Sequence, residues 1–135
     1  MTAAPQIWVE TPFFEIESGE DEETNPGVYG RAFAHWLADR LKARGESVEQ
    51  IVTEDWGRCV ILTRKPYLLW IGCGNRADRT DEWGAFVTAE PGIFQRLFRT
   101  VDTRPAVAHL HRVLNEIMHE VPHAAKVWSE DGPRR

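Results

Sequence analysis

The sequence predicts an α+β fold in which two helices pack against a mainly antiparallel sheet of four or five strands. Three observations lead to this prediction. A helical pattern of apolar residues follows Asn25-Pro26, short segments of high β-propensity follow one another between Val48 and Gly72, and a second helical pattern begins near Pro105. The expected order of elements is β-α-β-β-β-β-α, arranged as a two-layer sandwich.

The first part of the predicted fold is a strand followed by a helix. Residues 7–17 are rich in aromatic and β-branched side chains, and Pro12, which cannot donate to a ladder, indicates an edge position or a bend. The helix is predicted over residues 26–44, because Asn25 can cap its N-terminus and Pro26 suits its first position. Its apolar stripe consists of Tyr29, Phe33, Trp36, Leu37 and Leu41.

The middle of the chain predicts an antiparallel meander. Segments 48–54, 58–64 and 67–72 are separated by two turns, and a further strand is expected around residues 83–89. Both faces of the central strands carry apolar side chains, so each face needs a cover, from helices or from a partner. Self-association through the second face, and hence a homodimer, is one hypothesis. The residues assigned to this second face are Val60, Leu62, Leu68 and Trp70.

The C-terminal part is predicted to be helical. Residues 93–98 have the spacing of a short amphipathic helix, and Pro105 opens a longer one that should end at Pro122. We expect one domain over residues 1–128, because 135 residues with 42% apolar side chains suit one core. The polar segment 129–135 is predicted to be a loose tail.

Composition also bears on the cellular location. No apolar run approaches the ~20 residues needed to cross a bilayer, and the N-terminus lacks the pattern of a signal peptide. The two cysteines have apolar neighbours and no C-x-x-C spacing, which is typical of buried free thiols. We therefore expect a cytoplasmic protein without membrane association, of bacterial origin.

One segment matches a zinc motif, but the match conflicts with its own geometry. His119 to His123 read H-E-V-P-H and fit H-E-x-x-H, in which two histidines one helical turn apart bind zinc. Pro122 removes a backbone donor, and its ring collides with the carbonyl of Met118, so the helix should end before His123. We predict no metal site and no cofactor, and we identify no catalytic residue.

The highest density of charge lies between Glu15 and Glu23, where six carboxylates precede the first basic residue, Arg31. Residues 1–55 carry 12 acidic and 4 basic side chains and residues 56–135 carry 9 and 12, so the net charge of −5 conceals a polarised chain. Two interpretations remain open: the carboxylates complement the positive end of the following helix, or they attract a basic partner surface. The second interpretation assigns partner binding to Glu20, Asp21, Glu22 and Glu23.

Two tryptophans occur where aromatic side chains often anchor partners. Trp56 and Trp83 lie in E-D-W-G and D-E-W-G at predicted strand ends, and we add both, with Asp55, to the predicted partner-binding residues. Sealing the end of the sheet is the alternative role. A Trp-lined pocket there would instead suit a small enzyme or ligand-binding domain, with Arg58 and Asn75 as ligand contacts. Nucleic-acid binding is not expected, because aromatic and basic residues do not alternate.

Three segments carry a resemblance to known proteins. They are E-T-N-P-G-V-Y-G at Glu23–Gly30, E-D-W-G at Glu54–Gly57 and the strand L-L-W-I-G-C-G. With them the chain resembles, over about residues 10–90, a group of small single-domain bacterial proteins that has no assigned activity. In size, acidity and Trp content it is also similar to polymorphic-toxin immunity proteins. We therefore predict a non-enzymatic protein-binding domain, of the kind of an immunity-type or inhibitory factor, that engages a basic partner surface.

Overall fold

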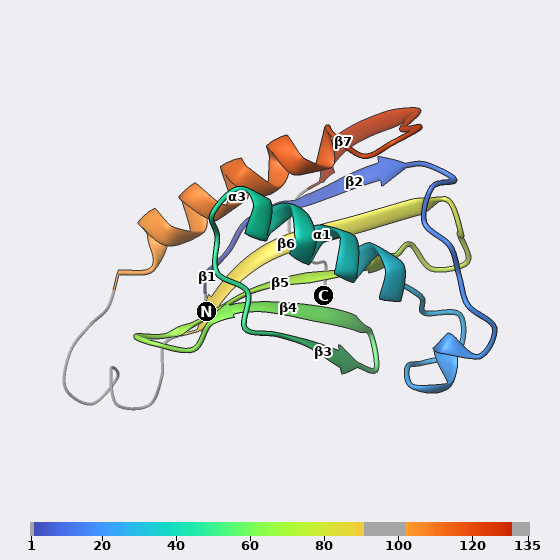
Figure 1. Ribbon diagram of the computed structural model, residues 1–135, viewed down its shortest axis with the longest axis horizontal. Helices are drawn as coiled ribbons and strands as arrows, with labels where there is room; N and C mark the ends of the chain where they lie inside the picture. Colours follow the sequence, from blue (N-terminus) through green and yellow to red (C-terminus); the bar gives the residue numbers. More distant parts are fainter. Residues whose placement is uncertain (1, 91–101, 131–135) are drawn as a thin grey trace.

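The chain folds as an α+β domain with two helices on one side of an antiparallel sheet. The computed structural model describes residues 2–90 and 102–130. Within them, a seven-stranded sheet carries helices α1 and α3 on the same face (Figure 1). The predicted fold class is confirmed, with more strands than the four or five expected. The elements are β1 (Thr2–Ala3), β2 (Gln6–Glu10), the 3-10 turn η1 (Glu20–Glu22), α1 (Arg31–Ala43), β3 (Gln50–Glu54), β4 (Gly57–Thr63), β5 (Leu68–Asn75), β6 (Glu82–Glu90), α3 (Arg104–Met118) and β7 (Lys126–Glu130).

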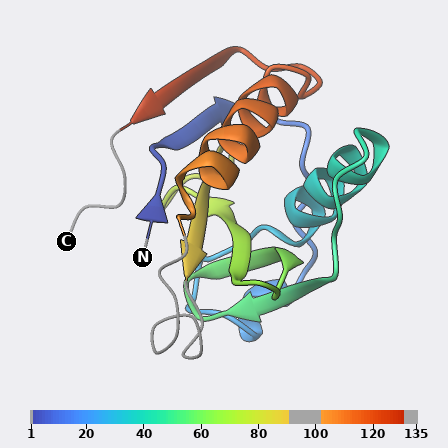
Figure 2. The ribbon, with the colours of Figure 1, turned by 90° about the vertical axis from the view of Figure 1, so that its left-hand side faces the viewer.

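The sheet combines the predicted meander with strands from both ends of the described chain. Its order is β3-β4-β5-β6-β2-β7, and the short β1 also pairs with β6. Strand β2 lies between β6 and β7 (Figure 2), where Trp8 pairs with Gly84 on one side and with Trp128 on the other. It is therefore an interior strand, not the edge strand that Pro12 suggested. Because β2 ends at Glu10, Pro12 takes no position in the ladder.

Strand β7 was not predicted. Lys126–Glu130 pairs antiparallel with Gln6–Glu10, so Ser129 and Glu130 belong to the sheet, although the sequence predicts a loose tail from residue 129. Residues 131–135 of that tail lie outside the described residues. A five-residue strand with a largely polar sequence gives little of the apolar alternation by which strands are recognised.

Helix α1 begins at Arg31, later than the Asn25-Pro26 start that the sequence predicts. The N–H of Val28 donates to the carbonyl of Asn25 at 3.0 Å, which closes a turn. Gly27 within this turn has φ of 81°, in the left-handed region that an α-helix excludes. The prediction of an Asn25 cap is therefore wrong: an Asn-Pro-Gly sequence suits a turn as well as a helix start, and here tertiary contacts select the turn.

Helix α3 agrees with the sequence more closely. It begins at Arg104, has Pro105 at its start and ends at Met118, before Pro122. The short helix expected over residues 93–98 lies outside the described residues.

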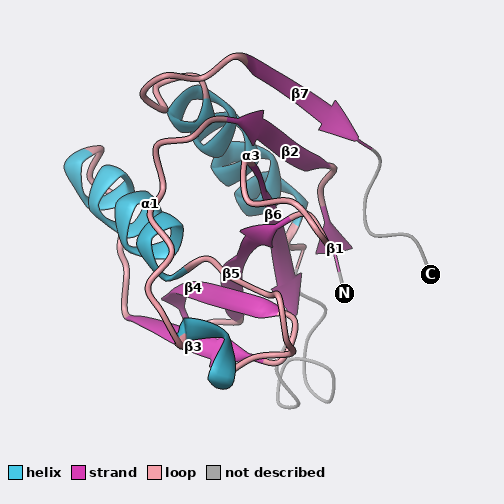
Figure 3. Ribbon diagram, turned by 90° about the vertical axis from the view of Figure 1, so that its right-hand side faces the viewer, coloured by secondary structure: helices cyan, strands magenta, loops and turns pink. Residues whose placement is uncertain are grey.

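The core lies between the helices and the sheet (Figure 3). The register places Val60 of β4 opposite Ile71 of β5, which in turn lies opposite Val87 of β6, and all three are fully buried beneath the helices. The helices contribute the fully or almost fully buried Phe33, Leu37, Leu41, Leu110, Leu114 and Ile117.

The same register corrects the predicted second apolar face. Val60 and Leu62 pack into the helix-covered core, whereas Trp70 lies opposite Ile61 and points to the other side of the sheet. The alternation within each strand was predicted correctly, but the wrong sides of neighbouring strands were joined, because register cannot be read from one strand alone. We call the side of the sheet opposite α1 and α3 the open face.

Glycines on the open face allow aromatic rings to lie flat against the backbone. A methyl group at Gly72 would lie 2.5 Å from the Phe86 ring and 3.0 Å from the Trp56 ring, and one at Gly84 would lie 2.6 Å from the Trp8 ring. The distances of 2.5 Å and 2.6 Å are shorter than non-bonded contacts of real Cβ atoms, and 3.0 Å is tighter than most of them. The positions therefore require glycine for space.

We predict that Gly72→Ala lowers the free energy of unfolding by about 1–3 kcal/mol, because the added methyl group overpacks against two rings. Gly74→Ala, in the same strand, is the matched control, since a methyl group there meets its nearest atom at an ordinary 3.4 Å. Urea unfolding followed by circular dichroism measures both. Equal losses in the two variants would contradict the packing argument.

Candidate functional site

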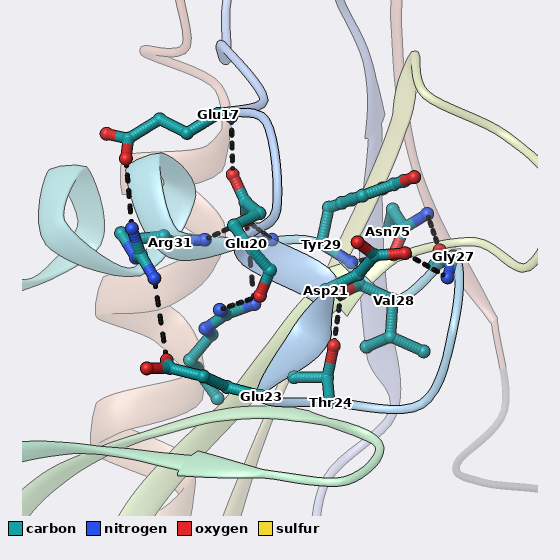
Figure 4. Close-up of polar contacts among 12 residues, drawn as sticks. Glu17, Glu20, Asp21, Glu23, Thr24, Gly27, Val28, Tyr29, Arg31 and Asn75 are labelled. Carbon is teal, nitrogen blue, oxygen red and sulfur yellow. Dashed lines mark hydrogen bonds and ion pairs between the residues drawn. The ribbon is translucent and has the colours of Figure 1, made fainter.

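The acidic segment between β2 and α1 is organised around one buried carboxylate, that of Glu20 (Figure 4). Glu20 is only 2% exposed. Its carboxylate accepts backbone N–H groups from Glu17 at 2.8 Å and from Gly30 and Arg31 at 3.1 Å each. Gly30 is the N-cap and Arg31 the first residue of α1, and N–H groups at these positions have no partner within the helix. Glu20 thus complements the positive end of α1, as the first interpretation of the acidic segment proposes.

Arg58 of β4 is the charged partner of Glu20. Its side chain is 2% exposed, and its Nη1 lies 3.7 Å from Glu20 Oε2, while its Nη2 donates to the Glu20 carbonyl at 3.5 Å. Burial raises the pKa of Glu20, but the three N–H donors and the Arg58 charge outweigh this effect, so its pKa lies below the usual value of 4.5. Arg58, a predicted ligand contact, is therefore engaged within the fold.

The other polar residues of the segment hold the same loop. Asp21 accepts the N–H of Gly27 at 2.9 Å. Asn75, the second predicted ligand contact, accepts the N–H of Tyr29 at 2.9 Å and donates to the Gly27 carbonyl at 3.0 Å, so it fastens the turn before α1 to β5 (Figure 4). These contacts give Asp21 and Asn75 a structural role.

The remaining predicted partner-binding carboxylates are exposed. Glu23 makes an exposed ion pair with Arg31 at 3.4 Å, and Glu22 projects from η1. Asp55 lies exposed in the turn between β3 and β4, where its carbonyl accepts the N–H of Asn25 at 2.7 Å. The six carboxylates of the acidic segment therefore do not form one common surface.

The two predicted tryptophans have opposite surroundings. Trp83 is 1% exposed and packs between Phe14 and Phe33 in the helix-covered core, so its ring is not on the surface. Trp56 is 45% exposed, one of two large apolar side chains with such exposure among the described residues. Of these two tryptophans, only Trp56 is placed to contact a partner through its ring.

Trp56 belongs to an aromatic cluster on the open face. Its ring centroid lies 5.9 Å from that of Trp70 and 6.1 Å from that of Phe86, and Trp70 and Phe86 are 5.7 Å apart. Gly72 lies beneath the Phe86 and Trp56 rings. The prediction from sequence missed Phe86 and placed Trp70 with the wrong neighbours. Gly72, which lies opposite Phe86, was a usable signal, because a glycine in a strand often indicates a ring packed on its backbone.

A pocket of about 370 Å³ opens beside this cluster. We call it the Trp56 pocket. Cys59 lines it, and burial, followed by the charges of Glu54 and Glu90, raises the pKa of this thiol to about 12. The thiol is therefore protonated at neutral pH and is a poor nucleophile. The pocket is lined by Val52, Glu54, Trp56, Cys59, Ile61, Arg64, Leu68, Trp70 and Glu90.

The opposite half of the open face holds a cation over a tryptophan. The Arg76 guanidinium lies 4.0 Å from the centre of the Trp8 ring. It donates to Glu82 at 2.7 Å and also to Glu130, which the Trp128 indole contacts as well. Arg76 thus stacks on a ring face and binds two carboxylates, so both its planar guanidinium and its charge take part in these contacts.

The histidines of the H-E-x-x-H match do not share a helix face. Helix α3 ends at Met118, the Nδ1–H of His119 donates to the Asn115 carbonyl at 2.7 Å, and His123 has φ of 58° beyond the helix. No group of three or more His, Cys, Asp or Glu that could hold a metal ion occurs in residues 2–90 and 102–130.

The fold and the site define an α+β domain with an aromatic sheet face. Comparison of the chain with protein-family models, with curated protein sequences and with solved structures finds no match. In the part of the chain that the structure describes, no helix has the length and apolar character needed to span a membrane. A proposal about the function therefore rests on the geometry of the site.

We predict that Glu20→Ala lowers the free energy of unfolding by about 3–5 kcal/mol, because it leaves the Arg58 charge buried without its carboxylate. Glu22→Ala, two residues away on the surface, should change it by about 0.5 kcal/mol or less. Urea unfolding of both variants measures the difference. A loss below about 1 kcal/mol in Glu20→Ala would contradict the role of the pair.

The lowered pKa of Glu20 also predicts how stability depends on pH. Because its pKa in the folded state lies below 4.5, the stabilisation is present above that pH and is lost as the pH falls through the folded-state pKa. Glu20→Gln, which keeps the shape and removes the charge, should therefore lose stability less steeply than the wild type as the pH falls below 4.5. Urea midpoints across this range test it, with Glu22→Gln as the control that should follow the wild type.

Proposed function

We propose that this chain is a non-enzymatic protein-binding domain that engages a basic partner surface through its open face, with Trp56 at the centre. The observation that carries the proposal is the 45% exposure of Trp56 within a cluster of rings. A tryptophan supported by Trp70 and Phe86 loses little side-chain entropy on binding. Such rigid, exposed aromatic side chains supply much of the binding free energy in protein interfaces.

Charge supports a basic partner. The chain carries a net charge of −5, and the exposed Glu22, Glu23 and Asp55 lie outside the ion pair that anchors the loop. An acidic surface accelerates association with a basic one and discriminates against acidic proteins. More specifically, we propose an immunity-type or inhibitory role, in which the domain covers the basic surface of its partner and blocks access to it.

The cysteines suit the expected compartment. Cys59 and Cys73 are buried free thiols, as is usual for proteins of the reducing bacterial cytoplasm. We place the binding role there.

A second candidate function is the binding of a small ligand in the Trp56 pocket. Its volume of about 370 Å³ lies at the lower end of the ~300–1,000 Å³ typical of ligand sites, which favours this candidate. A screen of small-molecule fragments by NMR tests it. Fragments that shift the Trp56 and Trp70 indole signals with affinities better than about 1 mM, a range typical of substrate sites, would favour this function over protein binding.

We predict that Trp56→Ala weakens partner binding at least about tenfold, a hot-spot effect. Phe13→Ala is the matched control, because Phe13 is similarly exposed at 40% but lies outside the sheet. Proteins retained by immobilised domain at low salt are identified and purified, and their affinities for the wild type and both variants are measured by calorimetry. Binding that tightens or stays constant with added salt, or that survives Trp56→Ala unchanged, would contradict the proposal.

A further inference from the structure

Strand β3 forms one edge of the sheet and lacks the features by which edge strands avoid pairing. Among the described residues its neighbour in the sheet is β4, so the other side of Gln50–Glu54 presents a row of backbone N–H and carbonyl groups (Figure 1). Protected edge strands commonly carry Lys or Pro, but residues 46–57 contain neither. Ile51, Val52 and Thr53 instead give the strand a high β-propensity.

The helices leave this edge accessible. Helix α1 packs against β4 and β5, and Figure 3 shows β3 at the lower edge of the sheet, below both helices. Thr53 and Glu54 are exposed, and Ile51 and Val52 are only half-buried. Another strand can therefore approach β3 from its free side.

The residues of β3 are complementary to those of a second β3 that runs antiparallel. In a symmetric pair centred on Val52, Gln50 of each copy lies opposite Glu54 of the other, and Ile51 lies opposite Thr53. Side chains that lie directly opposite each other share one face of a sheet. Ile51 therefore meets Thr53 on the helix side, and the two Val52 side chains meet on the open face, where Val52 lines the Trp56 pocket.

The charges at the two ends of β3 match in this arrangement. Arg64 donates to the Gln50 side chain at 2.8 Å and lies 3.7 Å from Glu49, so its half-exposed guanidinium is at the Gln50 end. Glu54, at the other end, makes no side-chain hydrogen bond or ion pair with any residue that the structure describes. The ends of a five-residue strand are roughly 13 Å apart, so Glu54 and Arg64 of one copy do not meet. Antiparallel pairing brings Glu54 of each copy beside Arg64 of the other, and both residues line the Trp56 pocket on the open face.

We propose that two copies of this chain associate through their β3 strands, antiparallel and centred on Val52, with an ion pair between Glu54 and Arg64 at each end. The two-fold axis of such a pair is perpendicular to the sheet, so both open faces point the same way. The dimer thus presents two exposed Trp56 side chains on one surface, which suits a partner that is itself dimeric or repetitive. The inference goes beyond the proposed function and does not depend on the basic partner.

Sedimentation equilibrium of the full chain, at concentrations up to about 1 mM, measures the association; this range suits an interface smaller than the standard ~1,200–2,000 Å². Glu54→Arg and Arg64→Glu should each raise the dissociation constant about tenfold or more, because like charges then face each other twice in the dimer. Glu15→Arg makes the same change of charge at an exposed position outside the sheet and should leave the association unchanged. Circular dichroism confirms that each variant is folded.

A mixture of the two variants is the sharpest test of the symmetric contact. A Glu54→Arg chain and an Arg64→Glu chain restore both ion pairs when they pair with each other, although each repels its own copies. The equimolar mixture should therefore associate about as tightly as the wild type, an effect that altered folding of either variant cannot produce. If Arg64→Glu fails to fold, concentration-dependent NMR shifts of the Gln50–Glu54 amides in the wild type test the same edge.

Three outcomes overturn the inference: a chain that stays monomeric at about 1 mM, a mixture that associates no better than either variant alone, and β3 amide signals that do not change with concentration. A dimer that Lys126→Glu disrupts also overturns it and assigns the contact to β7, at the other end of the strand order. Trp56→Ala should leave the dimer intact, because the Trp56 ring lies against Gly72 of β5, away from the free edge. Loss of the dimer and loss of partner binding are therefore separate results.

Discussion

The buried ion pair between Glu20 and Arg58 is the constraint on which the arrangement of the N-terminal half depends. It joins the loop before α1 to strand β4, while the same carboxylate receives the first N–H groups of the helix. A lone charge at either position would be costly to bury, so the loop, the helix start and the strand are stable only together. The acidic segment therefore has a structural centre, and its exposed carboxylates are attached to a rigid base.

The open face depends on a second constraint, the absence of side chains at Gly72 and Gly84. These glycines let the rings of Phe86 and Trp8 lie against the backbone. The rings then cover the central strands well enough that part of the face is buried although no helix of the described residues lies above it: Trp8 is only 8% exposed. Trp56 projects beyond this layer of rings. It is therefore exposed, whereas Trp8 on the same face is buried.

The sequence predicted the fold class and most elements, because periodicity and turn residues act locally. The prediction failed where contacts between residues far apart in the sequence determine the local structure. The Asn25-Pro26-Gly27 sequence favours a helix start, but its contacts with β5 select a turn. Trp56 and Trp83 have almost the same sequence neighbours, yet pairing with β2 places Trp83 in the core. Glu20 looked like one of six similar carboxylates, and no local pattern distinguishes the one that meets Arg58.

The position of β2 has a consequence for the order in which the chain can fold. Gln6–Glu10 is made early in synthesis, but its partners are Glu82–Glu90 and Lys126–Glu130. Its hydrogen bonds therefore wait for segments that leave the ribosome much later, and such long loops close slowly. The meander of β3 to β6 can assemble first, whereas the half of the face that holds Arg76 and Trp8 is completed only after β7 is released.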